Sequence, residues 1–203
     1  RRTIRVPRQW EGQRVFVVVG ACDWITQGWL DGKPIGEHRG GYTPFEFELT
    51  PEVRWGEEQQ LVLRVDDAPR PFKLEGKQGY GDAKGIWQTV YLEARPAVHI
   101  RSLHFVPDVD GNKVTVAVKL NAAAPVDGGL RLRFKNGEES DAETAIAAGA
   151  AAVTFDVRMN RAHLWSLDDP YLYEVEVRLS TAGSDDVVQS YFGMRKISVE
   201  KLP

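Results

Sequence analysis

The sequence predicts an all-β protein, and three observations carry that prediction. Short segments alternate apolar and polar residues with a period of two, as do strands with one buried face. Asp31-Gly32 separates two such segments and is typical of a two-residue hairpin turn. No stretch of the chain requires a helix longer than two turns.

The first half of the chain reads as a series of strands ended by turn residues. Pro7 ends the first strand, because proline cannot donate to a strand ladder. In the strand that follows the hairpin, Phe45, Phe47 and Leu49 share one face, and Tyr42 is expected in the core with them. The predicted strands are residues 2–6, 14–19, 27–30, 33–38, 42–49, 60–65 and 86–93.

The second half repeats this pattern after a linker at Pro96. Residues 142–152 are rich in alanine and can be read as a helix, but Gly149 and the short length favour an edge strand and a turn. With them, seven short strands at intervals of about 8–15 residues predict an immunoglobulin-like sandwich. The other strands are residues 99–106, 113–121, 129–135, 153–158, 171–179 and 187–192.

Composition restricts the classes of function. The chain has 203 residues, of which 42% are hydrophobic, so it can form one large β domain or two of about 100 residues. The net charge is −3, and no basic block suggests binding to nucleic acid or to a membrane surface. No apolar run approaches the ~18 residues of a membrane span.

The cysteine, histidine and acidic residues lack the spacing that disulfides, metal sites or catalytic carboxylate pairs require. Cys22, the single cysteine, excludes an internal disulfide and is expected to be a small buried side chain. The histidines lack metal-ligand spacing, so no metal or cofactor is predicted; His38 is expected to hydrogen-bond the turn after it. Neighbouring strand residues point to opposite faces, so the acidic pairs are read as structural. These pairs are Asp66-Asp67, Glu138-Glu139, Asp168-Asp169 and Asp185-Asp186.

Three segments resemble family 2 of the glycoside hydrolases, the β-galactosidase and β-glucuronidase family. They are DGKPIGEHRGGYTPFEFELT at residues 31–50, GKQ at 76–78 with GIWQTVYLE at 85–93, and LWSLDDPYLYEVEVRL at 164–179 with YFGMRK at 191–196. The resemblance implies a galactose-binding-like jelly-roll domain for sugar over residues 1–95, which lacks its first strands. An immunoglobulin-like domain over residues 97–200 would follow.

The resemblance also implies a role in hydrolysis of glycosidic bonds. In the family the catalytic glutamates lie on a (β/α)₈ barrel, which would begin where this chain ends, so no catalytic residue is expected here. The two domains would scaffold the barrel and shape its substrate entrance, and the intact enzyme would bind a β-glycoside. The first residues, RRTIRVPRQW, are not a signal peptide and read as a strand already under way. The N-terminus is therefore expected to be truncated, and the localisation, cytoplasmic or periplasmic, is left open. An exposed sheet edge would favour a homo-oligomer.

Residues 76–87, which include the end of the long irregular segment of residues 66–84, have the strongest signal for a binding site. Sugar recognition combines an aromatic face with amide, carboxylate and ammonium groups. In the family, the loop before GIWQ borders the active-site entrance and can contribute an acidic group. Trp87 is expected to be structural, and a loop that only packs on the barrel is the alternative. The candidate substrate-binding residues are Lys77, Gln78, Tyr80, Asp82 and Lys84.

Two other classes of function remain. A stand-alone carbohydrate-binding module would present exposed coplanar aromatic side chains, whereas the aromatic residues here alternate into expected core positions. A purely structural interaction sandwich is the other, and fold alone cannot exclude it.

Overall fold

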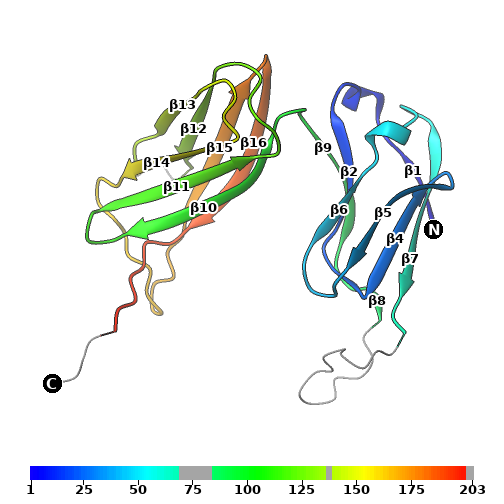
Figure 1. Ribbon diagram of the computed structural model, residues 1–203. Coiled ribbons are helices and arrows are strands. Elements are labelled where there is room, and N and C mark those ends of the chain that lie inside the picture. Colours follow the sequence, from blue (N-terminus) through cyan, green and yellow to red (C-terminus); the bar gives the residue numbers. More distant parts are fainter. Residues whose placement is uncertain (69–83, 136–138, 200–203) are drawn as a thin grey trace. The chain divides into compact units, whose positions relative to one another are not determined.

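The computed structural model of this chain describes residues 1–68, 84–135 and 139–199 and forms two compact units. Unit 1 is Arg1–Arg95 and unit 2 is Pro96–Pro203. Each described unit consists of β-strands, with short 3₁₀ turns in unit 1 (Figure 1). The prediction of an all-β protein is confirmed.

The described strands of unit 1 form three antiparallel sheets. The four-stranded sheet has the order β1-β7-β4-β5, the three-stranded sheet β6-β2-β9, and β3 pairs with β8. β2 is central in its sheet and every residue after its first is buried, as the continuous apolar run predicted. The elements are β1 (Arg2–Arg5), η1 (Arg8–Trp10), β2 (Arg14–Val19), β3 (Cys22–Asp23), β4 (Ile25–Leu30), β5 (Lys33–Arg39), β6 (Phe45–Glu48), η2 (Thr50–Glu52), β7 (Glu58–Asp66), β8 (Gly85–Ile86) and β9 (Val90–Arg95).

The β4–β5 hairpin turns at the two residues that the sequence indicated. Asp31 and Gly32 have φ values of 47° and 82°, as a type I′ turn requires. The Asp31 carboxylate accepts hydrogen bonds from the backbone N–H of Gln60 at 2.7 Å and the side-chain amide of Gln59 at 2.9 Å. These bonds fasten the turn to β7.

Phe47 joins the two larger sheets of unit 1 by packing on a pair of glycines. Gly28 of β4 and Gly36 of β5 are cross-strand partners. A Cβ built on Gly36 would lie 2.6 Å from Cδ1 of the Phe47 ring, and one built on Gly28 would lie 3.0 Å from Cδ2. The ring therefore lies directly on backbone, and only glycine leaves room for it.

One side of unit 1 contains an apolar groove. Among the described strands, β1 and β9 are edge strands of their sheets. The groove between them has a volume of about 440 Å³. It is lined by Ile4, Val17, Leu61, Leu63, Ile86, Val90, Tyr91 and Leu92, with Arg1 and Arg2.

Unit 2 is a sandwich of two antiparallel sheets, with the orders β10-β11-β14 and β13-β12-β15-β16 (Figure 1). Residues 142–146 form an edge strand and residues 148–149 a turn, so the expectation of an edge strand rather than a helix is confirmed. The strands are β10 (Ile100–Asp108), β11 (Lys113–Leu120), β12 (Gly128–Phe134), β13 (Ala142–Ile146), β14 (Ala152–Arg158), β15 (Tyr173–Thr181) and β16 (Ser184–Phe192).

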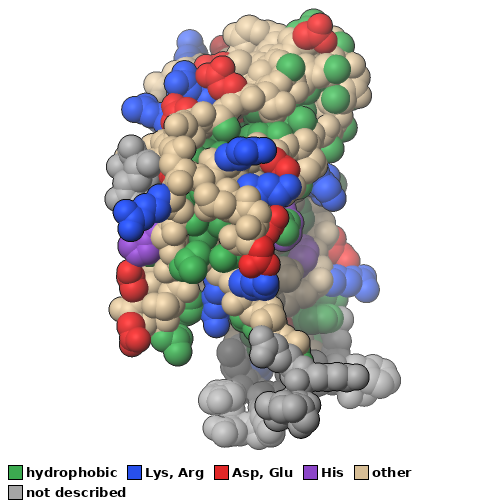
Figure 2. Space-filling model, turned by 90° about the vertical axis from the view of Figure 1, so that its left-hand side faces the viewer, with side chains coloured by type: hydrophobic (Ala, Val, Ile, Leu, Met, Phe, Trp, Pro, Cys, Tyr) green, Lys and Arg blue, Asp and Glu red, His purple; other side chains and the backbone are tan. Residues whose placement is uncertain are grey.

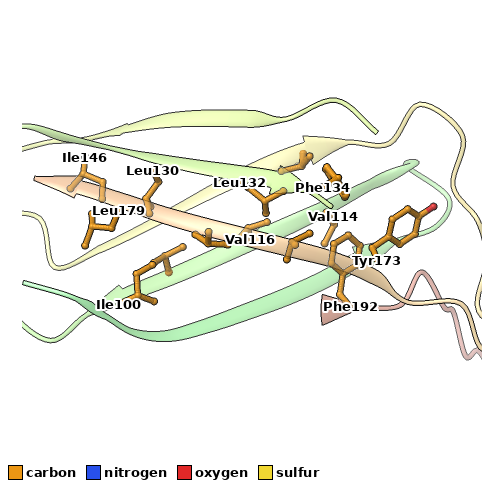
Figure 3. Close-up of a cluster of buried hydrophobic side chains, with 14 of the residues drawn as sticks. Ile100, Val114, Val116, Leu130, Leu132, Phe134, Ile146, Tyr173, Leu179 and Phe192 are labelled. Atoms are coloured by element: carbon orange, nitrogen blue, oxygen red, sulfur yellow. The ribbon is translucent and has the colours of Figure 1, made fainter. Parts of the chain in front are cut away.

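The core of unit 2 follows the alternation of its strands. Figure 3 shows buried side chains from both sheets pointing toward one another between the layers. Tyr173, the first residue of β15, is 1% exposed and stacks on Phe192 with ring centroids 5.2 Å apart. Its hydroxyl oxygen accepts a hydrogen bond from the backbone N–H of His163 at 2.6 Å. That bond ties the preceding loop to the core.

At one end of unit 1, two predicted strands differ from the observed ones. The single strand expected over residues 86–93 is divided into β8 and β9, because the backbone N–H groups of Trp87 and Gln88 turn toward the carbonyl of Ala21. The strand expected from residue 42 begins at Phe45, after a bend over residues 41–43. Both differences create the irregular end of unit 1.

A test of the glycine pair compares two substitutions in the same hairpin. Both Gly36→Ala and Gly32→Ala place a side chain at positive φ, but only the first meets a neighbouring atom within 4 Å. We expect Gly36→Ala to lower the free energy of unfolding by about 2 kcal/mol more than Gly32→Ala does, because it overpacks the core. Urea denaturation measures both losses, and equal losses would contradict the packing role of Gly36.

The Asp31 contacts predict a pH-dependent contribution to stability. Its hydrogen bonds with the Gln60 N–H and the Gln59 amide hold the pKa of the Asp31 carboxyl below its usual value. Because the folded-state pKa is lowered, the stabilisation is present above the unfolded pKa of about 3.9 and is lost as pH falls through the folded pKa. Asp31→Asn should therefore be less stable than the natural chain at pH 6 and converge with it near pH 2, as urea unfolding would report.

The control for this comparison is Glu11→Gln, which removes an exposed carboxylate from the same unit. A stability difference between Asp31→Asn and the natural chain that stayed constant with pH would contradict the assignment.

Candidate functional site

The candidate site lies at the end of unit 1 where β3 pairs with β8. Cys22 is the partner of Ile86, and Asp23 is the partner of Gly85. Of the predicted binding residues, Lys77, Gln78, Tyr80 and Asp82 lie outside the described residues. Lys84 is described, and it is exposed immediately before β8. The structure therefore describes only the end of the predicted binding segment, at Lys84, and the strands β3 and β8 next to it.

Trp87 is held by hydrogen bonds at both its ring and its backbone. The indole N–H donates to the carbonyl of Gly41 at 2.8 Å, and the backbone N–H donates to the carbonyl of Ala21 at 3.3 Å. The side chain is nevertheless 47% exposed. The structural role expected for Trp87 is visible in these contacts, but one part of the ring remains open to solvent.

Tyr42 is far more exposed than the sequence indicated. The expectation that it belongs to the core is wrong, because 79% of its surface is exposed. Its ring meets the Trp87 ring edge to face, with centroids 5.7 Å apart and planes inclined by 66°. The reason is the bend over residues 41–43, which interrupts strand alternation before β6 begins.

Gly41 brings the site's main groups together. It is buried, and a Cβ built on it would lie 3.0 Å from Oδ1 of Asp23. The backbone therefore passes close to the Asp23 carboxylate while its carbonyl receives the Trp87 indole. Asp23, Tyr42 and Trp87 come from three separate segments and meet at this residue.

The neighbouring His38 supports the bend by stacking. Its ring lies on Phe45, with centroids 4.0 Å apart and planes inclined by 10°. Its Nε2 atom is buried without a hydrogen-bond partner among the described residues, so the hydrogen bond expected from the sequence is not seen at this atom. The turn is closed instead by the Gly40 N–H, which donates to the carbonyl of Trp24 at 3.0 Å.

Cys22 is suited to packing rather than to nucleophilic chemistry. The side chain is 0% exposed, and burial raises the pKa of its thiol. A raised pKa lowers the thiolate fraction, which is the reactive form. The expectation of a small buried side chain is confirmed.

One member of each of three acidic pairs contacts a group of the fold. Glu139 accepts a hydrogen bond from the backbone N–H of Asn160 at 2.6 Å, and Asp186 accepts one from that of Ile100 at 2.7 Å. Asp169 lies 2.6 Å from Nε2 of His163. These contacts support the structural interpretation.

The described surface carries mixed charge. Figure 2 shows acidic and basic side chains interspersed on the face that it draws. In the described part of the chain, no group of three or more His, Cys, Asp or Glu side chains could hold a metal ion. Likewise, none of the helices formed by the described residues is long and apolar enough to cross a membrane.

Comparison with known proteins identifies relatives for both units. Residues 98–195 match the family model of the glycosyl hydrolases family 2. A β-galactosidase of Thermoanaerobacter pseudethanolicus is 26% identical over 94% of this chain and 27% of its own length. The β-galactosidase large subunit of Leuconostoc lactis is 28% identical over 98% of this chain and 32% of its own length. A β-glucuronidase of Paenibacillus borealis is 24% identical over 98% of this chain and 36% of its own length.

Solved structures show the same fold. A candidate β-galactosidase of Bacteroides fragilis has a TM-score of 0.82 at 25% identity, covering 98% of this chain and 32% of that one. The β-D-glucuronidase of Dictyoglomus thermophilum has a TM-score of 0.72 at 22% identity. The match covers 98% of this chain and 36% of that one. At this lower identity the second likeness concerns the fold alone.

These findings define the class of the protein as a pair of β-sandwich domains of the kind found in glycoside hydrolases. The chain is similar to glycosyl hydrolase family 2, whose model matches most of unit 2, and this is the family that its three sequence segments resemble. It spans between 27% and 36% of the length of the three curated relatives described above.

Sequence reasoning missed two features of the site. The two-residue strand β3 is too short to give a periodic signal. The exposure of Tyr42 could have been suspected from its position between Gly40-Gly41 and Thr43-Pro44, because such residues mark turns and turns lie at the surface.

The hydrogen bond from Trp87 to Gly41 predicts a measurable contribution to stability. Trp87→Phe keeps an aromatic ring but removes the only side-chain donor to this carbonyl that the described contacts include. We expect a loss of about 1 kcal/mol in the free energy of unfolding, measured by urea denaturation. Tyr42→Phe, which keeps its ring contact, is the control and should change stability by only a few tenths of a kcal/mol. Equal losses in both variants would contradict this assignment.

Proposed function

We propose that this chain forms two non-catalytic domains of an enzyme that hydrolyses O-glycosidic bonds of β-linked sugars. The single observation that carries the proposal is the extent of the matches. Nearly all of this chain aligns with about a third of β-galactosidases and β-glucuronidases. The full-length relatives are named as β-galactosidases or β-glucuronidases. We therefore propose glycosidase activity for an enzyme that contains this chain, and not for the chain alone.

In this proposal unit 1 is a jelly-roll sugar-binding domain and unit 2 an immunoglobulin-like sandwich. Two observations support the second assignment. Unit 2 consists of two antiparallel sheets, and the Tyr173 hydroxyl accepts a hydrogen bond from the backbone of His163, ten residues earlier. The described residues form no (β/α)₈ barrel. The catalytic glutamates would be supplied by a barrel domain, as the family resemblance implies.

An exposed apolar surface on unit 2 supports a scaffolding role. Leu167 is 86% exposed and Leu164 is 50% exposed, beside Trp165, whose ring carries the Arg195 guanidinium at 4.3 Å. Neighbouring large apolar side chains in contact with water favour an interface. We propose that this surface packs against the barrel, while the Tyr42–Trp87 end of unit 1 borders the substrate entrance.

The exposed rings of Tyr42 and Trp87 also favour a second candidate, a stand-alone carbohydrate-binding module. Sequence reasoning counted against it because both residues were assigned to structural positions. Their exposed fractions of 79% and 47% show that neither ring is a core side chain, although the ring planes are inclined by 66° and are not coplanar. The two candidates differ in whether the gene product hydrolyses a glycoside.

A side-by-side activity assay distinguishes the two candidates. The complete gene product and the 203-residue chain are each incubated with para-nitrophenyl β-galactoside, β-glucuronide and β-mannoside. We expect the complete product to release nitrophenol from one of them, and the 203-residue chain to release none above buffer. Hydrolysis by the chain itself would overturn the non-catalytic role, and inactivity of the complete product on all three would favour the binding module.

A further inference from the structure

We propose that Tyr42 and Trp87 form a stacking platform for a pyranoside ring, which makes this end of unit 1 a carbohydrate-binding subsite. The inference rests on the proposed function, because it names the ligand of the region assigned there to the substrate entrance. It differs from the sequence-based candidate set, which contains neither residue.

The two rings form a contiguous aromatic surface in contact with water. Tyr42 is 79% exposed and Trp87 is 47% exposed, and their centroids are only 5.7 Å apart. Single exposed apolar side chains are common, but adjacent ones signal a binding surface. A pyranoside presents a face of C–H groups that can cover such rings, and it removes their apolar area from water.

The inclination of the rings suits a ligand with two different faces. Because the planes meet at 66°, they form a corner rather than a continuous flat strip. One ring can lie under the C–H face of a sugar while the other contacts its edge. A flat aromatic ligand would stack on one ring alone, so the corner favours a saturated ring.

Trp87 and the backbone next to Tyr42 are held by hydrogen bonds before any ligand arrives. The Trp87 indole donates to Gly41 at 2.8 Å, its backbone N–H is bonded to Ala21, and the Gly40 N–H is bonded to Trp24 at 3.0 Å. These bonds link the ring positions to β3, β4 and the bend before β6. Binding therefore orders few side chains, which lowers its entropic cost.

Polar groups of the kind that take sugar hydroxyls lie next to the rings. The Asp23 carboxylate adjoins Gly41, whose carbonyl receives the Trp87 indole. A carboxylate accepts hydrogen bonds from hydroxyl groups. Lys84 is exposed and immediately precedes Gly85, the cross-strand partner of Asp23, so its ammonium group is the nearest candidate donor along the chain. An aromatic corner with an acceptor and a donor beside it matches the mixed chemistry of a pyranoside.

The test is a titration of the ¹⁵N-labelled 203-residue chain followed by NMR. Methyl β-galactopyranoside and methyl β-glucuronide are the two probes, and they distinguish a neutral sugar from a sugar acid. The indole N–H signal of Trp87 is assigned by its disappearance in Trp87→Phe. We expect this signal to shift in a saturable manner with at least one probe, at roughly millimolar concentrations.

Two variants separate the platform from nonspecific effects. Tyr42→Ala should raise the dissociation constant at least about fivefold, because it removes one of the two stacked faces. Tyr191→Ala is the matched control, since Tyr191 is 65% exposed on β16 of unit 2. It should leave the dissociation constant unchanged. The dispersion of each variant's amide spectrum reports whether it is folded.

A ligand-observed measurement keeps the proposal testable if Tyr42→Ala does not fold. Saturation of the protein's aromatic protons should transfer to the C–H protons of the bound probe in the natural chain. Absence of both this transfer and the indole shift, with both probes, would overturn the platform. The same holds if Tyr42→Ala is folded and binds as tightly as the natural chain.

The outcomes separate this inference from the proposed function. If the complete gene product hydrolyses a glycoside but the chain binds neither probe, the platform is wrong and the proposed function stands. If the chain binds a probe at Trp87 but the complete product hydrolyses no glycoside, the platform stands and the hydrolase assignment is wrong.

Discussion

The contact between the Phe47 ring and the glycine pair determines much of unit 1. Gly28 and Gly36 have no side chains, and the Phe47 ring from the opposite sheet packs directly on the backbone of their two neighbouring strands. This places β6, and Phe45 two residues earlier can then stack on His38. The bend before Phe45 follows, with Gly41 next to Asp23 and its carbonyl available to Trp87. A packing constraint in the core is thereby transmitted to an exposed aromatic pair.

The strands of unit 2 are more regular than those of unit 1. Long strands alternate so regularly that most inward positions carry Val, Leu or Phe, as in β15, where Tyr173, Val175, Val177 and Leu179 are all buried. The loop before that strand is irregular but is fastened by the Tyr173 hydroxyl. In unit 1, by contrast, the alternation is interrupted before β6, and Tyr42 in that bend is 79% exposed.

Sequence reasoning succeeded wherever one physical signal dominated. Period-two alternation located the strands of both halves, and Asp31-Gly32 located the hairpin turn. It failed at the candidate site for a specific reason. β8 and β9 are separated because two N–H groups turn toward Ala21, and that carbonyl lies more than sixty residues earlier in the chain. The position of Tyr42 beside Trp87 also depends on contacts between distant segments, which no local pattern encodes.

The two hydrophobic clusters draw their residues from separate stretches of sequence. The cluster of unit 1 runs from Ile4 to Leu92, and that of unit 2 from Val98 to Met194. Substitutions at distant sites without shared partners usually act additively. Mutational change in one core is thus insulated from the other. Residues of the first cluster can therefore change while the second cluster accumulates its own neutral variation.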